Sequence, residues 1–166
     1  MADGVFEVQV VTPEQQLLEV PAKALVLRSS DGDLTILDGH TALVTDVVPS
    51  DVRVDPEEGE PVHLAVHGGY LQVETGTEPD EKRTRATLLA GVAELADQID
   101  VPRAQEAKAQ AESRIDALKA AGRTSGGASA ASADGEAPSP EDVELAAAEA
   151  ALRRADVRLE VAGATS

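Results

Sequence analysis

The sequence has 166 residues, a formal net charge of -17 and no cysteine, which fits one domain or a small domain with an appendage. Such a negative charge disfavours binding to nucleic acids or anionic lipid surfaces, and the lack of cysteine excludes disulfides and thiolate chemistry. One Phe, one Tyr and no Trp leave few rings for stacking on bases. We therefore expect no nucleic-acid partner, and contact with a membrane only through other proteins. MADGVFEVQV at the start of the sequence lacks the pattern of a signal peptide.

Apolar residues recur at every second position up to about residue 96. The pattern is clear in VFEVQVV, in VHLAVH and in YLQVET, and it indicates half-buried strands. Turn-forming stretches such as SSDGD, LDGH, PEEGEP and HGG separate these segments. Many short strands at such spacing predict an all-β sandwich or flattened barrel over residues 1–96.

The period changes in residues 97–166, where two amphipathic helices are predicted. Asp100 is placed to cap the first helix, Pro102 fits its first turn, and Gly122 is placed to end it. Ser139 and Asp142 form a capping-box pattern at the start of the second helix. The apolar stripes, which recur in steps of three and four, are Ala104, Ala107, Ala111, Ile115 and Leu118 in the first helix, and Leu145, Ala148, Leu152, Ala155, Leu159 and Ala162 in the second.

A Gly/Ser/Ala-rich segment, residues 122–139, separates the two helices and is typical of a flexible linker. Two helices of similar length with matching stripes predict an antiparallel helical hairpin in the C-terminal domain. Because the stripes are mostly alanine, they bury less apolar surface than leucine would, so we expect this hairpin to be only marginally stable.

The three histidines can be interpreted either as metal or catalytic residues or as solvent-facing and turn residues. His63 and His67 are four apart, a zinc-ligand spacing on a helix, but on a strand they lie about 13 Å apart and are expected to face solvent. His40 follows the turn dipeptide Asp38-Gly39, so it is expected to hold the turn or to contact a partner. A metal-dependent hydrolase using His40 is the competing hypothesis, although no nucleophile motif accompanies it.

Five segments in order resemble the epsilon subunits of F-type, rotary ATP synthases. They are VVTPEQQLLE at residues 10–19, the G-[DE]-L and G-H pattern in SSDGDLTILDGHTAL, GGYLQVETG at 68–76, IDVPRA at 99–104 and ALRRADVRLEVA at 151–162. The chain departs from the family pattern at Thr35, Ala42, Pro102 and Gln110. A freestanding β-sandwich interaction module with a partner-docking hairpin is the alternative, and it would have no reason to show this order.

The resemblance implies a non-catalytic subunit that couples proton-driven rotation to ATP synthesis at the cytoplasmic face of the bacterial membrane. Its partners would be the gamma subunit and the c-ring, and its mobile helices would inhibit ATP hydrolysis by the catalytic alpha and beta subunits. The rotor-facing residues implied are Asp31, Asp33, Gly39 and His40.

The resemblance implies no required cofactor, but it does imply a regulatory ATP site. The residues that match the family's nucleotide motif are Ile99, Asp100, Arg103, Ala104, Arg154 and Arg158. Arg154 and Arg158 are one helical turn apart, which lets both guanidinium groups reach one polyphosphate. The alternative is that Asp100 is only a helix cap and that the arginines pair with Glu106, Glu149 or Glu160 on an exposed face.

Overall fold

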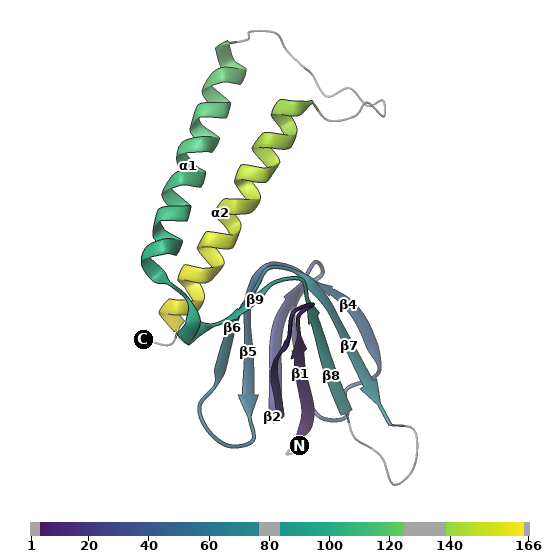
Figure 1. The fold of residues 1–166 in the computed structure, drawn as a ribbon. Helices are drawn as coiled ribbons and strands as arrows, with labels where there is room; N and C mark the ends of the chain where they lie inside the picture. The colour runs from purple at the N-terminus through teal and green to yellow at the C-terminus, as the bar shows by residue number, and fades with distance from the viewer. Residues whose placement is uncertain (1–3, 77–83, 125–138, 165–166) are drawn as a thin grey trace. The chain divides into compact units, whose positions relative to one another are not determined.

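The computed structural model describes residues 4–76, 84–124 and 139–164 (Figure 1). Strands fill the first part of the chain, and a short 3₁₀ helix, η1 (Ala96–Gln98), leads into the helices α1 (Val101–Thr124) and α2 (Pro140–Ala164). The strands are β1 (Phe6–Val11), β2 (Gln16–Ser29), β3 (Gly32–Ile36), β4 (Leu43–Val47), β5 (Ser50–Pro56), β6 (Val62–Val66), β7 (Gly69–Thr75), β8 (Thr84–Ala90) and β9 (Ala93–Leu95).

The strands form one folded sheet in the order β4-β7-β8-β1-β2-β5-β6-β9, with β3 paired to β2. Neighbours are antiparallel except for β1 and β8, which are parallel. The long strand β2 pairs with β1 through its first half and with β3 and β5 through its second half, so it belongs to both layers. The predicted β-sandwich followed by two helices is confirmed.

The core lies between the two layers and is aliphatic apart from Phe6. Side chains of β1, β5, β7 and β8 alternate between buried and more exposed positions, as the period of two predicts. The buried residues are Phe6, Val8, Val10, Ala22, Leu25, Leu27, Ile36, Val47, Val52, Val54, Leu64, Val66, Leu71, Val73, Ala86, Leu88 and Ala90.

The chain divides into two compact units, which are described separately. The first comprises the residues up to Ile99 together with those from Val157 onward, and the second comprises Asp100–Asp156. The predicted domain boundary at residues 96 and 97 stays a prediction, and the last turns of α2 group with the sheet in this division.

Both helices of the second unit begin as predicted. The Arg103 N–H donates to Oδ1 of Asp100 at 3.0 Å, and the Ala104 N–H donates to the Asp100 carbonyl at 2.9 Å. Ser139 and Asp142 bond reciprocally, each backbone N–H donating to the other's side-chain oxygen at 3.2 Å. These bonds satisfy N–H groups that the first helical turn leaves without a partner.

The end of the first helix differs from the prediction. Helix α1 continues through Gly122 to Thr124, so the first three residues of the predicted linker are helical, while residues 125–138 lie outside the described residues. A glycine inside a helix costs only about 1 kcal/mol relative to alanine. Gly122 alone is therefore too weak a signal to stop the helix.

Helices α1 and α2 run side by side and antiparallel within the second unit (Figure 1). Lys108 Nζ lies 2.8 Å from Asp156 Oδ1, and Arg114 Nη2 lies 2.7 Å from Glu144 Oε2. Lys108 precedes Arg114 in α1, whereas its partner Asp156 follows Glu144 in α2, so the two helices pair in antiparallel register. The predicted stripes supply its buried residues, Ala104, Ala111, Ile115, Ala148 and Ala155.

No helix in the described part of the chain is both long and apolar enough to cross a lipid bilayer.

Candidate functional site

The loop between β3 and β4 is fixed by hydrogen bonds to the ends of β7 and β8. Gly39 has a φ of +77°, which glycine adopts readily. Its N–H donates to Oγ1 of Thr84 at 2.8 Å, and Thr75 Oγ1 donates to the His40 carbonyl at 2.6 Å. Because Thr84 is fully buried, the backbone of this loop is anchored to the sandwich.

His40 lies within this turn. Its backbone N–H donates to the Leu37 carbonyl at 3.1 Å, and its ring Nδ1 is 2.8 Å from the Thr41 carbonyl oxygen. A carbonyl only accepts, so this contact requires the proton on Nδ1. Among the described residues, no three His, Asp or Glu side chains gather as a metal site. The geometry of His40 is that of a turn residue.

The structure does not bring the four predicted rotor-facing residues into one loop. Asp31 lies in the β2–β3 turn and Asp33 near the start of β3, where it forms an ion pair with Arg28 at 2.7 Å. Gly39 and His40 lie beyond the other end of β3, and the four steps along that strand span about 13 Å. Residues 32–36 form a strand between the two turns, and the assignment of the four residues to the rotor interface stays a prediction.

His63 is also placed differently from the prediction. It was expected to face solvent, but it is half-buried on β6, and its Nδ1 lies 2.8 Å from Oδ2 of Asp51 on β5. The strand register places Asp51 opposite Ala65 and His63 opposite Arg53, so the pair is diagonal across the two strands.

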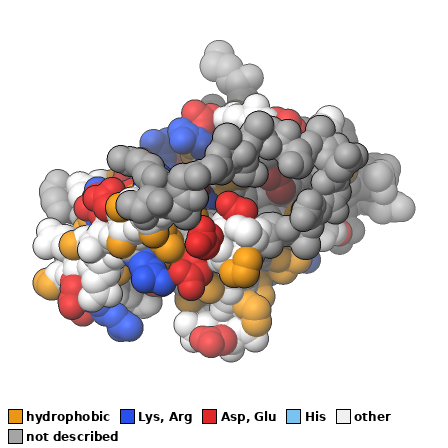
Figure 2. All heavy atoms as spheres, turned by 90° about the horizontal axis from the view of Figure 1, so that it is seen from above, with side chains coloured by type: hydrophobic (Ala, Val, Ile, Leu, Met, Phe, Trp, Pro, Cys, Tyr) orange, Lys and Arg blue, Asp and Glu red, His pale blue; other side chains and the backbone are white. Residues whose placement is uncertain are grey.

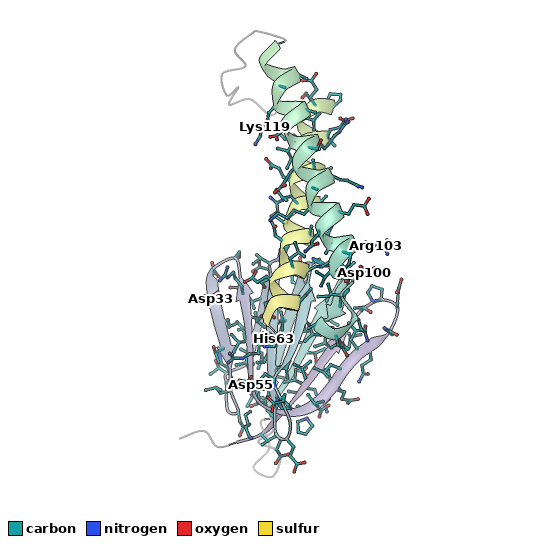
Figure 3. The ribbon with its side chains drawn as sticks, turned by 90° about the vertical axis from the view of Figure 1, so that its left-hand side faces the viewer. Asp33, Asp55, His63, Asp100, Arg103 and Lys119 are labelled. Carbon is teal, nitrogen blue, oxygen red and sulfur yellow. The ribbon has the colours of Figure 1, made fainter. Side chains whose placement is uncertain are left out.

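Asp100, Arg103 and Ala104 of the predicted nucleotide site share the first turn of α1. Figure 3 shows Asp100 and Arg103 close together at this helix start. Asp100 is engaged as the cap, Arg103 is exposed, and Ala104 is buried. Arg154 is exposed on α2. The cap interpretation of Asp100 therefore holds, whether or not its carboxylate has a second role.

Ile99 and Arg158 belong to the first unit. Ile99 is buried with Ala65, Val157 and Val161 in a small apolar cluster. Arg158 forms a bidentate ion pair with Glu94 of β9, in which its Nε lies 3.0 Å from one carboxylate oxygen and its Nη2 bonds the other. The alternative expectation named Glu106, Glu149 or Glu160 as the acidic partners of the arginines, whereas the partner of Arg158 is Glu94. Because the six residues divide between the two units, the nucleotide site stays a prediction.

An exposed apolar surface lies on the outer face of the layer that contains β4, β7, β8 and β1. We define the apolar surface as Val44, Tyr70 and Leu89, which are exposed, together with the half-buried Val11. Leu89 pairs directly with Tyr70 on one side and with Val11 on the other. Val44 is diagonal to Tyr70, since Asp46 is the direct partner of Tyr70. Val44 and Tyr70 are 71% and 63% exposed, and contiguous surfaces of this kind mark interaction sites.

Sequence reasoning missed this apolar surface, although it contained a signal. In YLQVET, Leu71 and Val73 were assigned to the core, which places Tyr70 on the outer face with Gln72 and Glu74. The only tyrosine of the chain therefore occupies a position where polar residues were expected. Figure 2 shows acidic and basic side chains interspersed on the face of the molecule that it draws. The negative net charge therefore does not make that drawn face uniformly acidic.

Comparison with known proteins gives matches along nearly the whole chain. Residues 5–96 match the family model "ATP synthase, Delta/Epsilon chain, beta-sandwich domain", and residues 97–163 match "ATP synthase, Delta/Epsilon chain, long alpha-helix domain". The ATP synthase epsilon chain of Symbiobacterium thermophilum is 36% identical over 165 residues, covering 99% of this chain and 96% of that one. The epsilon chain of Natranaerobius thermophilus is 31% identical with the same coverage.

A solved structure of the mitochondrial ATP synthase of Euglena gracilis, an assembly of OSCP, F1 and the c-ring, contains a chain with the same fold. The TM-score is 0.68 at 18% identity, and the match covers 99% of this chain and 86% of that one. The family models and the epsilon-chain relatives agree over both domains. The chain belongs to the delta/epsilon chain family of the ATP synthase, as an epsilon chain.

Proposed function

We propose that this chain is a non-catalytic subunit of the central stalk of the F-type ATP synthase and couples proton-driven rotation to ATP synthesis. It would bind the gamma subunit and the c-ring and reach the cytoplasmic face of the bacterial membrane only through that complex. The observation that carries the proposal is the apolar surface around Tyr70, which gives the sandwich an exposed apolar face suited to docking a partner protein.

Transmission of torque requires a rigid body with two partner surfaces. Tyr70 and Leu89 lie near one end of β7 and β8, whereas Thr75 and Thr84, which anchor the His40 loop, lie at the other end. The five steps along β7 from Tyr70 to Thr75 span about 16 Å. We assign the gamma subunit to the apolar surface and the c-ring to the His40 loop.

The gamma assignment is tested by titrating purified gamma subunit with the full chain and with Tyr70→Asp. A charge placed in an apolar interface should weaken binding at least about tenfold. Thr35→Asp is the matched control, because Thr35 is exposed on β3 in the same unit, and it should leave the affinity within about twofold. Failure of the full chain to bind the gamma subunit would end the coupling proposal, and equal binding by Tyr70→Asp would move the interface elsewhere.

The proposed function includes inhibition of ATP hydrolysis by the helices in contact with the alpha and beta subunits, and a regulatory ATP. The proposal of a nucleotide site is supported by Arg103 and Arg154, which are exposed and whose guanidinium groups can donate hydrogen bonds to phosphate oxygens. Isothermal titration of ATP into the full chain and into Arg103→Ala tests this site. We expect heat from the full chain and a loss of most of it in the variant. No heat at millimolar ATP would remove the nucleotide site without touching the coupling role.

A further inference from the structure

The last turns of α2 pack on the outer face of the sheet at β6 and β9. Val157 and Val161 are buried there with Ala65 and Ile99, and Ala96 and Ala162 pack against the same cluster. Strand alternation places Ala65 on the side of β6 opposite to Leu64 and Val66, which belong to the sandwich core. Ala65 therefore lines a second, separate apolar contact, and it is fully buried.

The residues beside Ala65 define this contact. Across the three strands, Ala65 pairs with Asp51 of β5 on one side and with Glu94 of β9 on the other. Its small side chain leaves room for the valines of α2 between two acidic neighbours. Asp51 is paired with His63, and Glu94 is paired with Arg158 of α2 itself.

The Glu94–Arg158 pair is well placed to hold the helix. Both oxygens of the carboxylate accept hydrogen bonds from the guanidinium group, a geometry stronger than a single contact. The Arg158 and Glu94 side chains are 28% and 30% exposed. In the pair Arg114–Glu144, the two side chains are 58% and 56% exposed. The hydrogen bond to Glu94 raises the pKa of Arg158 above its usual value, so the arginine stays charged.

The apolar contact beneath this pair is small. Apart from Val157 and Val161, the residues that meet the sheet from α2 contribute little apolar surface, and alanines make up half of the cluster. Loss of one charge would leave the other partly enclosed without its partner, which disfavours the docked state beyond the lost attraction. A small apolar contact and one enclosed ion pair together make docking depend strongly on that pair.

We propose that Glu94 and Arg158 form a latch that holds the last turns of α2 on the sheet, and that removing either charge releases them. The latch is a property of the isolated chain. Its consequence for inhibition rests on the function proposed above, because release frees the C-terminal segment for other subunits.

The chain has no cysteine, which allows a direct test. A single Val161→Cys places a thiol where the side chain is fully buried, so a maleimide can label it only when the segment leaves the sheet. In the Glu94→Gln and Arg158→Gln backgrounds we expect labelling about tenfold faster or more. Arg153→Gln is the matched control, since Arg153 lies on the same helix and is exposed, and it should leave the labelling rate unchanged.

Two further measurements keep the test decisive. The exchanged pair, Glu94→Arg with Arg158→Glu, should recover most of the slow labelling, and amide hydrogen exchange in β7 and β8 should be the same in all variants if the sandwich stays folded. Equal labelling rates in all backgrounds, or an equal rise with Arg153→Gln, would overturn the latch. No gamma subunit is present in these assays, so their outcome is independent of the proposed coupling role.

Discussion

Several polar side chains predicted to bind ligands or partners are already bonded within the chain. Asp100 accepts the Arg103 N–H, Arg158 holds Glu94, and Asp33 pairs with Arg28. The last of these pairs is highly exposed and contributes little to stability. The enclosed pair and the cap contribute more, so a ligand role for Asp100 or Arg158 has to be compatible with a structural one.

Thr84 provides a test of the anchored loop at the scale of a single side chain. Thr84→Val keeps the shape of the side chain but removes the acceptor for the Gly39 N–H. We expect the free energy of unfolding, measured by urea denaturation, to fall by about 1 kcal/mol.

Thr87→Val is the control for this prediction, because Thr87 lies on the same strand and faces the opposite side of the sheet. It should change the free energy of unfolding by less than about 0.5 kcal/mol. Equal losses in both variants would mean that Thr84 stabilises the strand rather than the His40 loop.

At the scale of elements, short sequence patterns predicted the strand faces and the helix start, which depend on interactions between nearby residues. The alternation in β1 and β7 predicted which side chains fill the core, and the pattern Ser139–Asp142 predicted the start of α2. These features depend on residues within a few positions of one another, where the strand period and capping chemistry are sufficient. The site features that depend on distant segments were not predicted.

Arg158 and Ala65 show why contacts between distant segments could not be predicted from the sequence. The partner of Arg158 lies 64 positions earlier in the sequence, and the pattern of α2 contains nothing that selects Glu94 over Glu160. Alternation correctly placed Ala65 away from the core, but a second buried contact on that face comes from α2. Val157 and Val161 lie outside the predicted stripe because that stripe accounts only for packing between the two helices.

The start of α1 allows the two roles of Asp100 to be separated. Serine also caps helices but has no carboxylate, so Asp100→Ser should keep the stability of α1 to within a few tenths of a kcal/mol, whereas Asp100→Ala should lose about 1 kcal/mol. Hydrogen exchange in the first turns of α1 measures this difference. If ATP titration weakens in both variants, the carboxylate binds the nucleotide; if serine destabilises α1 as much as alanine, capping is not its main role.

At the scale of the whole molecule, the sandwich core is independent of the helices. All residues of the main core cluster lie within the first 90 positions, while the helices have their own buried stripe and ion pairs. Among the described residues, the apolar cluster that takes side chains from the end of α2 is the one around Ala65 and Ile99. We therefore expect the sandwich to keep its proposed binding to the gamma subunit when the helices, with their proposed inhibition of ATP hydrolysis, are removed.

A chain that ends at Ile99 tests this separation. It loses the cover that Val157 and Val161 provide, so we expect a fall of about 2 kcal/mol in the free energy of unfolding, with the sandwich still folded by circular dichroism. Because Tyr70 and Leu89 remain, its affinity for the gamma subunit should match that of the full chain. A reconstituted complex that carries it should hydrolyse ATP faster than one with the full chain, since the inhibitory helices are gone. Unchanged hydrolysis would show that the helices do not inhibit, and an unfolded product would show that the sandwich needs the end of α2 to fold.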